Sequence, residues 1–227
     1  MPAGLRLILA VLLAATIRAG TAAAACTVPD PVKVLVTIDA PPVVYDHTLP
    51  RAAIKQREIA FNRRSHSEAD VVLGTTETRI QPQARLQIEA RPDGAGRFCA
   101  TVASLSVVID WKAVVHVASE LEGGSCMYNV VMTHEQGHVD IARSLMGKAK
   151  DLIGRALSAV ARKGATAATP ETAYQALQQA GAKALDGAMS KLNAEMERRQ
   201  QAHDNPEEYA RGRKVCGITA YYNALGR

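Results

Sequence analysis

Two histidines and a glutamate lie close together in the stretch CMYNVVMTHEQGHVDIA, residues 126–142. His134 and His138 are four residues apart, so on a helix their imidazoles differ by about 40° around the axis and can both reach one ion. Glu135 lies about 100° from His134, beside such an ion rather than bound to it. The H-E-x-x-H pattern on a helix is how zinc peptidases place two ligands and a base. The spacing therefore predicts one zinc ion on His134 and His138, with Glu135 as the general base for a zinc-activated water.

A plainer interpretation makes both histidines core residues that are bonded to backbone carbonyls. Each would then need its own buried partner, which is harder to arrange than one shared ion. Gly137 favours the metal site, because a glycine inside a helix costs about 1 kcal/mol relative to alanine. That cost is understandable if another group must approach the backbone closely there.

A catalytic zinc ion usually has three protein ligands, so one more must be found. The stretch that follows His138 lacks the glycine and third histidine of metzincins, and no glutamate has the thermolysin-like arrangement. The stretch AHDNPEEYARG, residues 202–212, offers Asp204 as the predicted third ligand, with His203 and Glu208 next. Alternatively, Asp204 and Glu208 only help to start a helix beside its positive dipole end.

The surrounding residues predict an α+β fold, in which a sheet packs on the H-E-x-x-H helix. A β-branched strand is expected at 32–38 and a short helix at 50–62. Four further strands with period-two alternation are expected, at 71–80, 84–90, 98–110 and 114–119. This order predicts a meandering, mostly antiparallel sheet. His116, on the last of these strands, is interpreted as exposed or bonded to a neighbour.

Helical spacing of apolar residues begins after Ser125, which can cap a helix. One long helix should extend to about Arg162, and KGATAATP should separate it from a second one at 171–201. Both carry apolar residues on one side, as the helices of a C-terminal hairpin require. A third helix should begin at Asn205, because Pro206 follows in the first helical position.

The first 25 residues resemble a secretory signal, in which Arg6 precedes an apolar run too short to span a bilayer. We therefore expect an exported chain, periplasmic or secreted, with no membrane span. Its sheet and H-E-x-x-H helix should occupy 26–163, and a helical extension packed on the same domain should occupy 164–227. A lipid anchor on Cys26 is the weaker alternative, because the leucine expected three residues earlier is absent.

The chain has four cysteines: Cys26, Cys99, Cys126 and Cys216. An even number in an exported protein favours two structural disulfides over thiolate metal ligation. Three pairings are possible, and the sequence does not choose among them.

The charge of the exported chain is small, since loss of Arg6 and Arg18 with the signal lowers it from +5 to +3. With an aromatic content of 4%, this composition disfavours nucleic-acid binding. We expect a peptide or protein substrate and no nucleic-acid partner. The oligomeric state is not indicated.

The stretch SCMYNVVMTHEQGHVDIA, with VVHVASE before it and VVYDHT and GTTET earlier, resembles a bacterial family of predicted secreted zinc-dependent proteases, catalogued as a domain of unknown function. The resemblance covers about residues 32–145 and is strongest around the helix. It implies a zincin-like α+β domain with His134 and His138 as zinc ligands and Glu135 as catalytic base. It implies no substrate.

The expected function is therefore that of an exported zinc metallopeptidase. One alternative is a non-enzymatic periplasmic binding or envelope-assembly protein on a zincin fold, and another is a cell-wall peptide amidase. The first alternative is disfavoured by Glu135, since a structural zinc ion needs no carboxylate at that place. The sequence does not separate peptidase from amidase, because substrate subsites are not visible in it.

Overall fold

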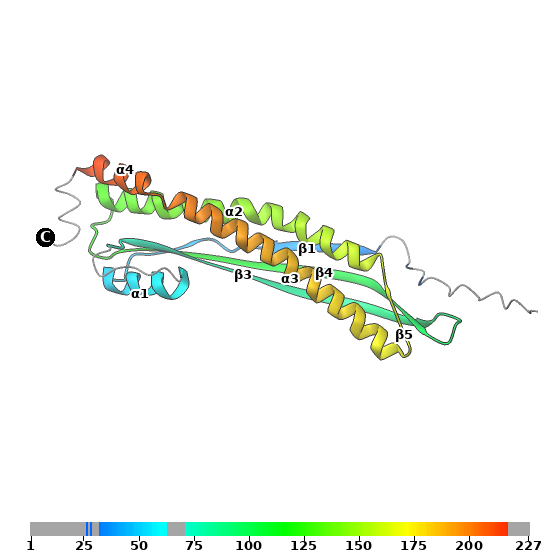
Figure 1. The fold of residues 1–227 in the computed structure, drawn as a ribbon. Helices are drawn as coiled ribbons and strands as arrows, with labels where there is room; N and C mark the ends of the chain where they lie inside the picture. The colour runs from blue at the N-terminus through cyan, green and yellow to red at the C-terminus, as the bar shows by residue number, and fades with distance from the viewer. Residues whose placement is uncertain (1–25, 27, 29–31, 63–70, 218–227) are drawn as a thin grey trace, which may run out of the picture.

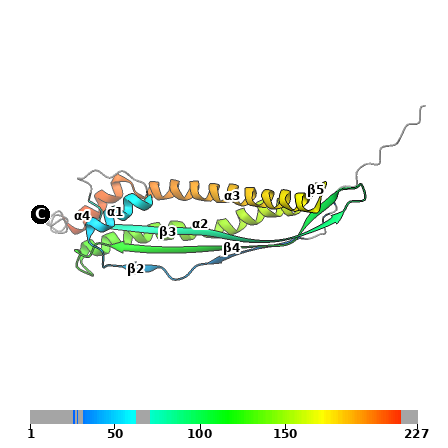
Figure 2. The same cartoon turned by 90° about the horizontal axis from the view of Figure 1, so that it is seen from below.

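The computed structural model describes residues 26, 28, 32–62 and 71–217 of the 227-residue chain. The expected secretory signal at 1–25 lies outside the described residues. Within them the fold is α+β, with five strands in one sheet and four helices. The molecule is elongated, and two long helices lie over one face of the sheet (Figures 1 and 2).

The sheet is built around one long strand. Its members are β1 (Lys33–Asp39), β2 (Val44–Asp46), β3 (Gly74–Pro92), β4 (Phe98–Val117) and β5 (Ala165–Ala167). β3 is antiparallel to β4 along its whole length, and β5 is antiparallel to the start of β4. β1 and β2 are parallel to later segments of β4. Because a strand has two edges, β1, β2 and β5 share the edge of β4 that β3 leaves free.

The expectation of a meandering, mostly antiparallel, zincin-like sheet is wrong. β1 and β2 both run parallel to β4, so the sheet is mixed. The expected breaks near Pro82 and at 110–112 do not occur. Where four short strands were expected, the chain forms two long ones, β3 and β4. Pro82 is tolerated because β3 pairs only with β4 among the described residues, and an edge strand can lack an N–H. Asp110 and Lys112 continue the alternation, because both point away from the core while Trp111 is buried.

The four helices are α1 (Arg51–Asn62), α2 (Cys126–Ala161), α3 (Pro170–His203) and α4 (Pro206–Cys216). Two of them, α2 and α4, begin at capping residues that the sequence predicts. The Ser125 side chain accepts a hydrogen bond from the N–H of Tyr128 at the start of α2. The Asn205 side chain accepts one from the N–H of Glu208 at the start of α4. Both predictions of helix starts are confirmed.

Neighbouring residues of β3 reach opposite faces of the sheet. The Thr75 hydroxyl donates to Glu58 of α1, and the Thr76 hydroxyl donates to Oε2 of Glu135 on α2 at 2.8 Å. Because successive side chains of a strand alternate between faces, α1 and α2 lie on opposite sides of β3. Figure 1 shows α1 and α2 separated by the sheet.

The core lies between the sheet and the two long helices. Fully buried residues recur along α2 with helical spacing, at Val139, Leu145, Ile153 and Leu157. They face a row of buried β4 residues on the inner side of the sheet: Leu105, Val107, Ile109, Trp111, Ala113 and Val115. Burying one such Leu, Ile or Val side chain stabilises the fold by about 1.5–3 kcal/mol. This packing holds the H-E-x-x-H segment of α2 against β3 and β4.

Two disulfides join distant parts of the chain, Cys26 to Cys99 and Cys126 to Cys216. No cysteine is free among the described residues, so the prediction of two bridges is confirmed, and the fold supplies the pairing. The first bridge uses the Cys26 thiol that a lipid anchor would need. Two disulfides indicate an oxidising environment, as exported proteins meet.

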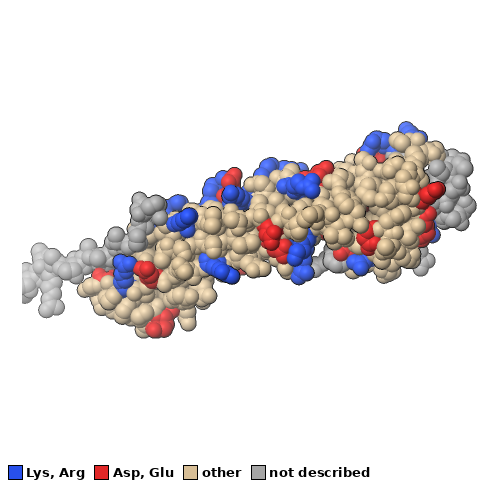
Figure 3. Space-filling view, turned by 180° about the vertical axis from the view of Figure 1, so that it is seen from behind, with Lys and Arg blue, Asp and Glu red and all other residues tan. Residues whose placement is uncertain are grey.

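The surface carries charges of both signs. On the face drawn in Figure 3, Lys and Arg side chains are interspersed with Asp and Glu side chains along the length of the molecule. None of the described helices has the length and apolar character needed to cross a membrane.

Candidate metal centre

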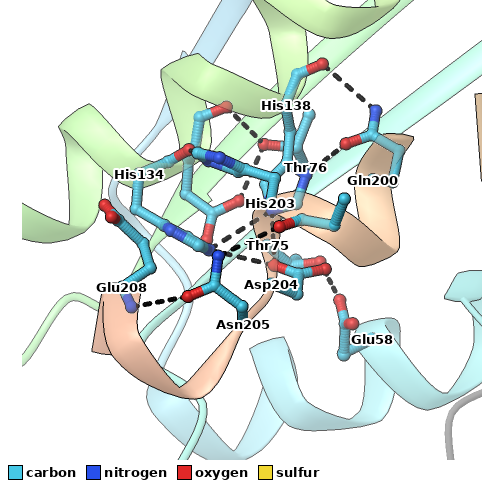
Figure 4. Close-up of polar contacts among 12 residues, drawn as sticks. Glu58, Thr75, Thr76, His134, His138, Gln200, His203, Asp204, Asn205 and Glu208 are labelled. Atoms are coloured by element: carbon cyan, nitrogen blue, oxygen red, sulfur yellow. Dashed lines mark hydrogen bonds and ion pairs between the residues drawn. The ribbon is translucent and has the colours of Figure 1, made fainter. Parts of the chain in front are cut away.

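The candidate site lies where α2 meets the junction of α3 and α4. His134 and His138 come from the first half of α2, one turn apart. His203 is the last residue of α3, and Asp204 is its C-cap with φ −81° and ψ 55°. Asn205 then caps α4, so the chain leaves helical conformation beside the two histidines of α2 (Figure 4).

Three polar atoms at this junction form a small triangle. The Nε2 atoms of His134 and His138 are 3.3 Å apart. Oδ1 of Asp204 lies 3.1 Å from Nε2 of His134 and 2.9 Å from Nε2 of His138. Ligand atoms around a tetrahedral zinc ion with bonds of 2.0–2.1 Å are about 3.3 Å apart. The triangle therefore has nearly the size of one face of such a coordination shell.

His203 completes a group of three histidines that could hold a metal ion. One ring nitrogen from each of His134, His138 and His203 lies within 4.8 Å of the others. The ring of His203 stacks on that of His134 with centroids 4.6 Å apart, and meets that of His138 edge-on at 4.8 Å. Sequence reasoning ranked His203 behind Asp204, and the fold brings both residues to the site.

Hydrogen bonds orient two of these imidazoles. Nδ1 of His138 donates to Oε1 of Gln200, whose Nε2 donates to the His138 carbonyl at 3.2 Å. This leaves Nε2 of His138 to face the centre. Nε2 of His203 donates to the His134 carbonyl at 3.0 Å. Metal-binding histidines commonly make such a bond with the nitrogen that does not bind the metal.

Gly137 makes room for His203. A Cβ atom at Gly137 would overlap Nε2 and Cε1 of the His203 ring. The hypothesis that a group approaches the helix backbone closely at this glycine is confirmed, and the group is an imidazole of the candidate centre.

Glu135 is buried between α2 and β3, with 5% of its surface exposed. The Thr76 hydroxyl donates to its carboxylate at 2.8 Å. Gly74 leaves space for the carboxylate, because a Cβ atom there would lie 2.8 Å from Oε1 of Glu135. Burial raises the pKa of Glu135, although the charges of His138 and His134 and the Thr76 hydrogen bond act in the opposite direction.

The electrostatics of the site favour a positive charge. Burial favours the neutral form of His138, but the hydrogen bond to Asp204 and the negative charges of Glu135 and Asp204 outweigh it. Together with the Gln200 hydrogen bond they raise the pKa of His138 to about 9. Buried carboxylates that stabilise an imidazolium in this way would also stabilise a metal cation.

Two other sequence candidates have different surroundings. Glu208 pairs with Arg211, whose hydrogen bond holds the pKa of Glu208 below its usual value, and its N–H binds the Asn205 cap. His116 is 4% exposed, and its Nδ1 lies 3.0 Å from Oδ2 of Asp46. It therefore fits the expectation of a histidine bonded to a neighbour.

Sequence reasoning missed the residues that support the centre. Gly74 and Thr76 lie in the GTTET stretch, which contributes to the family resemblance but contains no pattern that predicts a role for either residue. Gln200 carried one weak signal, since it precedes His203 by one helical turn and so shares its face of α3.

No protein-family model matches the chain, and no match was found among curated proteins or solved structures.

Proposed function

We propose that this protein is an exported zinc metallopeptidase that hydrolyses peptide bonds in a peptide or protein substrate. The observation that carries the proposal is the triangle of His134, His138 and Asp204, with Glu135 buried next to the two histidines. In this proposal those three residues hold one zinc ion, and Glu135 is the general base.

The donor set suits zinc better than calcium or magnesium. Two imidazole nitrogens and one carboxylate oxygen are the ligand types of catalytic zinc sites, whereas calcium and magnesium prefer oxygen alone. When bound, a zinc ion supplies a Lewis acid that polarises a carbonyl and makes water acidic.

The chain's own residues would perform the proton transfers. Glu135 would take a proton from water and pass it to the leaving amine. Its raised pKa suits this role, because a carboxylate with a higher pKa accepts a proton more readily. Thr76 would hold the carboxylate in place through its 2.8 Å hydrogen bond. Gln200 would fix the ring of His138 so that Nε2 faces the centre.

The second candidate is a non-enzymatic binding or envelope-assembly protein with structural zinc. Two observations favour it: Glu135 is only 5% exposed, and His203 supplies a further donor near the triangle. An amidase that acts on cell-wall peptides would use the same centre with a different substrate.

The first experiment is elemental mass spectrometry of the mature, tag-free protein and of His134→Ala. The proposal expects about one zinc per chain in the wild type and a large loss in the variant. Asp140→Asn is the matched control, because Asp140 lies on the exposed side of α2 and pairs with Arg143. Absence of zinc after reconstitution, or equal zinc in all three proteins, would overturn the proposed centre.

The second experiment compares the wild type with Glu135→Gln on a peptide library and on cell-wall peptides, with mass spectrometry of the products. The peptidase proposal expects cleavage of library peptides, and a loss of at least about 100-fold in Glu135→Gln with zinc retained. Cleavage of cell-wall peptides alone would favour the amidase. No cleavage of either by a zinc-loaded wild type would favour the non-enzymatic candidate.

A further inference from the structure

His203 has the hydrogen-bonding arrangement of a metal ligand, although three ligands are already provided. Its Nε2–H donates to the His134 carbonyl, and this tautomer leaves a lone pair on Nδ1. In His138 the two nitrogens have the opposite roles: Nδ1–H donates to Oε1 of Gln200, and Nε2 faces the centre. Histidines that bind metals are commonly fixed in this way by a carbonyl group.

The chain brings His203 and Asp204 to the same place by ending a helix there. α3 ends at His203, Asp204 leaves the helical region, and Asn205 begins the cap of α4. Two consecutive side chains can therefore both reach α2, which would be difficult for neighbours that are about 100° apart on one continuous helix. Gly137 allows the His203 ring to approach the α2 backbone.

We infer that the resting protein holds its metal with four protein donors, His134, His138, His203 and Asp204, and that a substrate must displace one of them before the proposed peptidase can act. This inference rests on the metal centre of the proposed function. A zinc site with four protein ligands is closed, whereas a catalytic site keeps one position open. His203 is the donor that must leave, because the other three already form the triangle. Withdrawal of its ring from Gly137 opens the fourth position without disturbing Glu135 or Thr76.

The test uses cobalt(II) as the bound metal, because its visible spectrum reports coordination, and azide as a small probe of an open position. The full mature chain is compared with His203→Ala and with Gln201→Ala, an exposed neighbour that contacts Glu197. We expect wild type and Gln201→Ala to bind one cobalt ion with a tetrahedral spectrum that azide does not change. His203→Ala should bind cobalt at least about 10-fold more weakly in a chelator competition, and azide should change its spectrum.

A second variant keeps the test decisive if His203→Ala does not fold. His203→Gln retains an amide N–H for the His134 carbonyl but has no ring nitrogen, so it should respond to azide as His203→Ala does. Far-UV circular dichroism establishes which variant is folded.

The outcomes separate this inference from the proposed function. An azide response in wild type equal to that of the folded variant, or unchanged cobalt affinity in that variant, overturns the four-donor centre and leaves the peptidase proposal in place. Failure of wild type to bind either zinc or cobalt overturns both.

Discussion

The imidazole of His203 occupies the space beside Gly137 where any other residue would carry its Cβ atom. The two residues are 66 positions apart in the chain, one on α2 and the other at the end of α3. Their contact joins the end of α3 to the H-E-x-x-H segment of α2. The glycine between the two histidines is therefore part of the candidate centre, although it has no side chain.

Gly137→Ala should weaken zinc binding. In an exposed helix this change would stabilise the protein by about 1 kcal/mol, but here the new methyl group would displace His203. Isothermal titration with zinc and thermal unfolding measure the two effects. Gly147→Ala on the same helix is the control, because no other part of the described chain lies within 4 Å of its Cβ position, and it should raise stability with unchanged zinc affinity. Equal zinc affinity in both variants would contradict the role assigned to Gly137.

Thr76→Val should destabilise the fold by about 1.5–3 kcal/mol, because it removes a hydrogen bond to the buried carboxylate of Glu135. Urea denaturation measures the change. Thr78→Val is the matched control on the same face of β3, since the buried Thr78 hydroxyl has no hydrogen-bond partner among the residues that the structure describes. That substitution should be neutral or stabilising. A loss of similar size in both variants would show that the hydroxyl bond to Glu135 has no special role.

Removal of metal should lower the unfolding temperature of the wild type. A ligand that binds only the folded state stabilises it by about 2.7 kcal/mol at 100 times its dissociation constant. Thermal scans with a chelator, and then with added zinc, measure this difference. His138→Ala should unfold at the same temperature under both conditions. An equal shift in the variant would place the stabilising metal elsewhere.

The Asp46 carboxylate should make stability depend on pH under acidic conditions. Hydrogen bonds from Thr48 hold its pKa below the ordinary value of 3.8, and His116 acts in the same direction. A lowered folded-state pKa contributes stability above the unfolded pKa, and that contribution is lost as pH falls through the folded-state pKa. Asp46→Asn should therefore be less stable than wild type at pH 7, and the difference should disappear in strong acid. Urea denaturation at a series of pH values measures it, with Asp39→Asn at the end of β1 as control.

The sheet illustrates why strand order was mispredicted. The segment 71–90 contains Pro82, and a proline indicates an interruption of the strand if that strand has hydrogen-bonded partners on both sides. Its place at an edge removes that objection, but edge position is a property of the whole sheet. The parallel pairing of β1 and β2 with β4 likewise depends on which edge of β4 remains free.

In the candidate metal centre, too, some features follow from local sequence and others only from the fold. The positions of His134, Glu135 and His138 on one helix follow from local spacing, as do the caps at Ser125 and Asn205, because helical geometry is set within four residues. Asp204 lies close to His134 and His138 although it is 70 and 66 residues from them in the chain, and periodicity gives no signal for such a contact.

The sequence by itself therefore determined the helix that carries His134, Glu135 and His138, the helix starts and the number of disulfides. Only the tertiary structure decided the disulfide pairing, the approach of His203 to Gly137, the burial of Glu135 against Thr76 and the parallel strands. The physical reason is that the first set depends on neighbours along the chain. The second depends on how α3 packs along α2, and how both pack on the sheet, which is decided by burial of apolar surface over the whole fold.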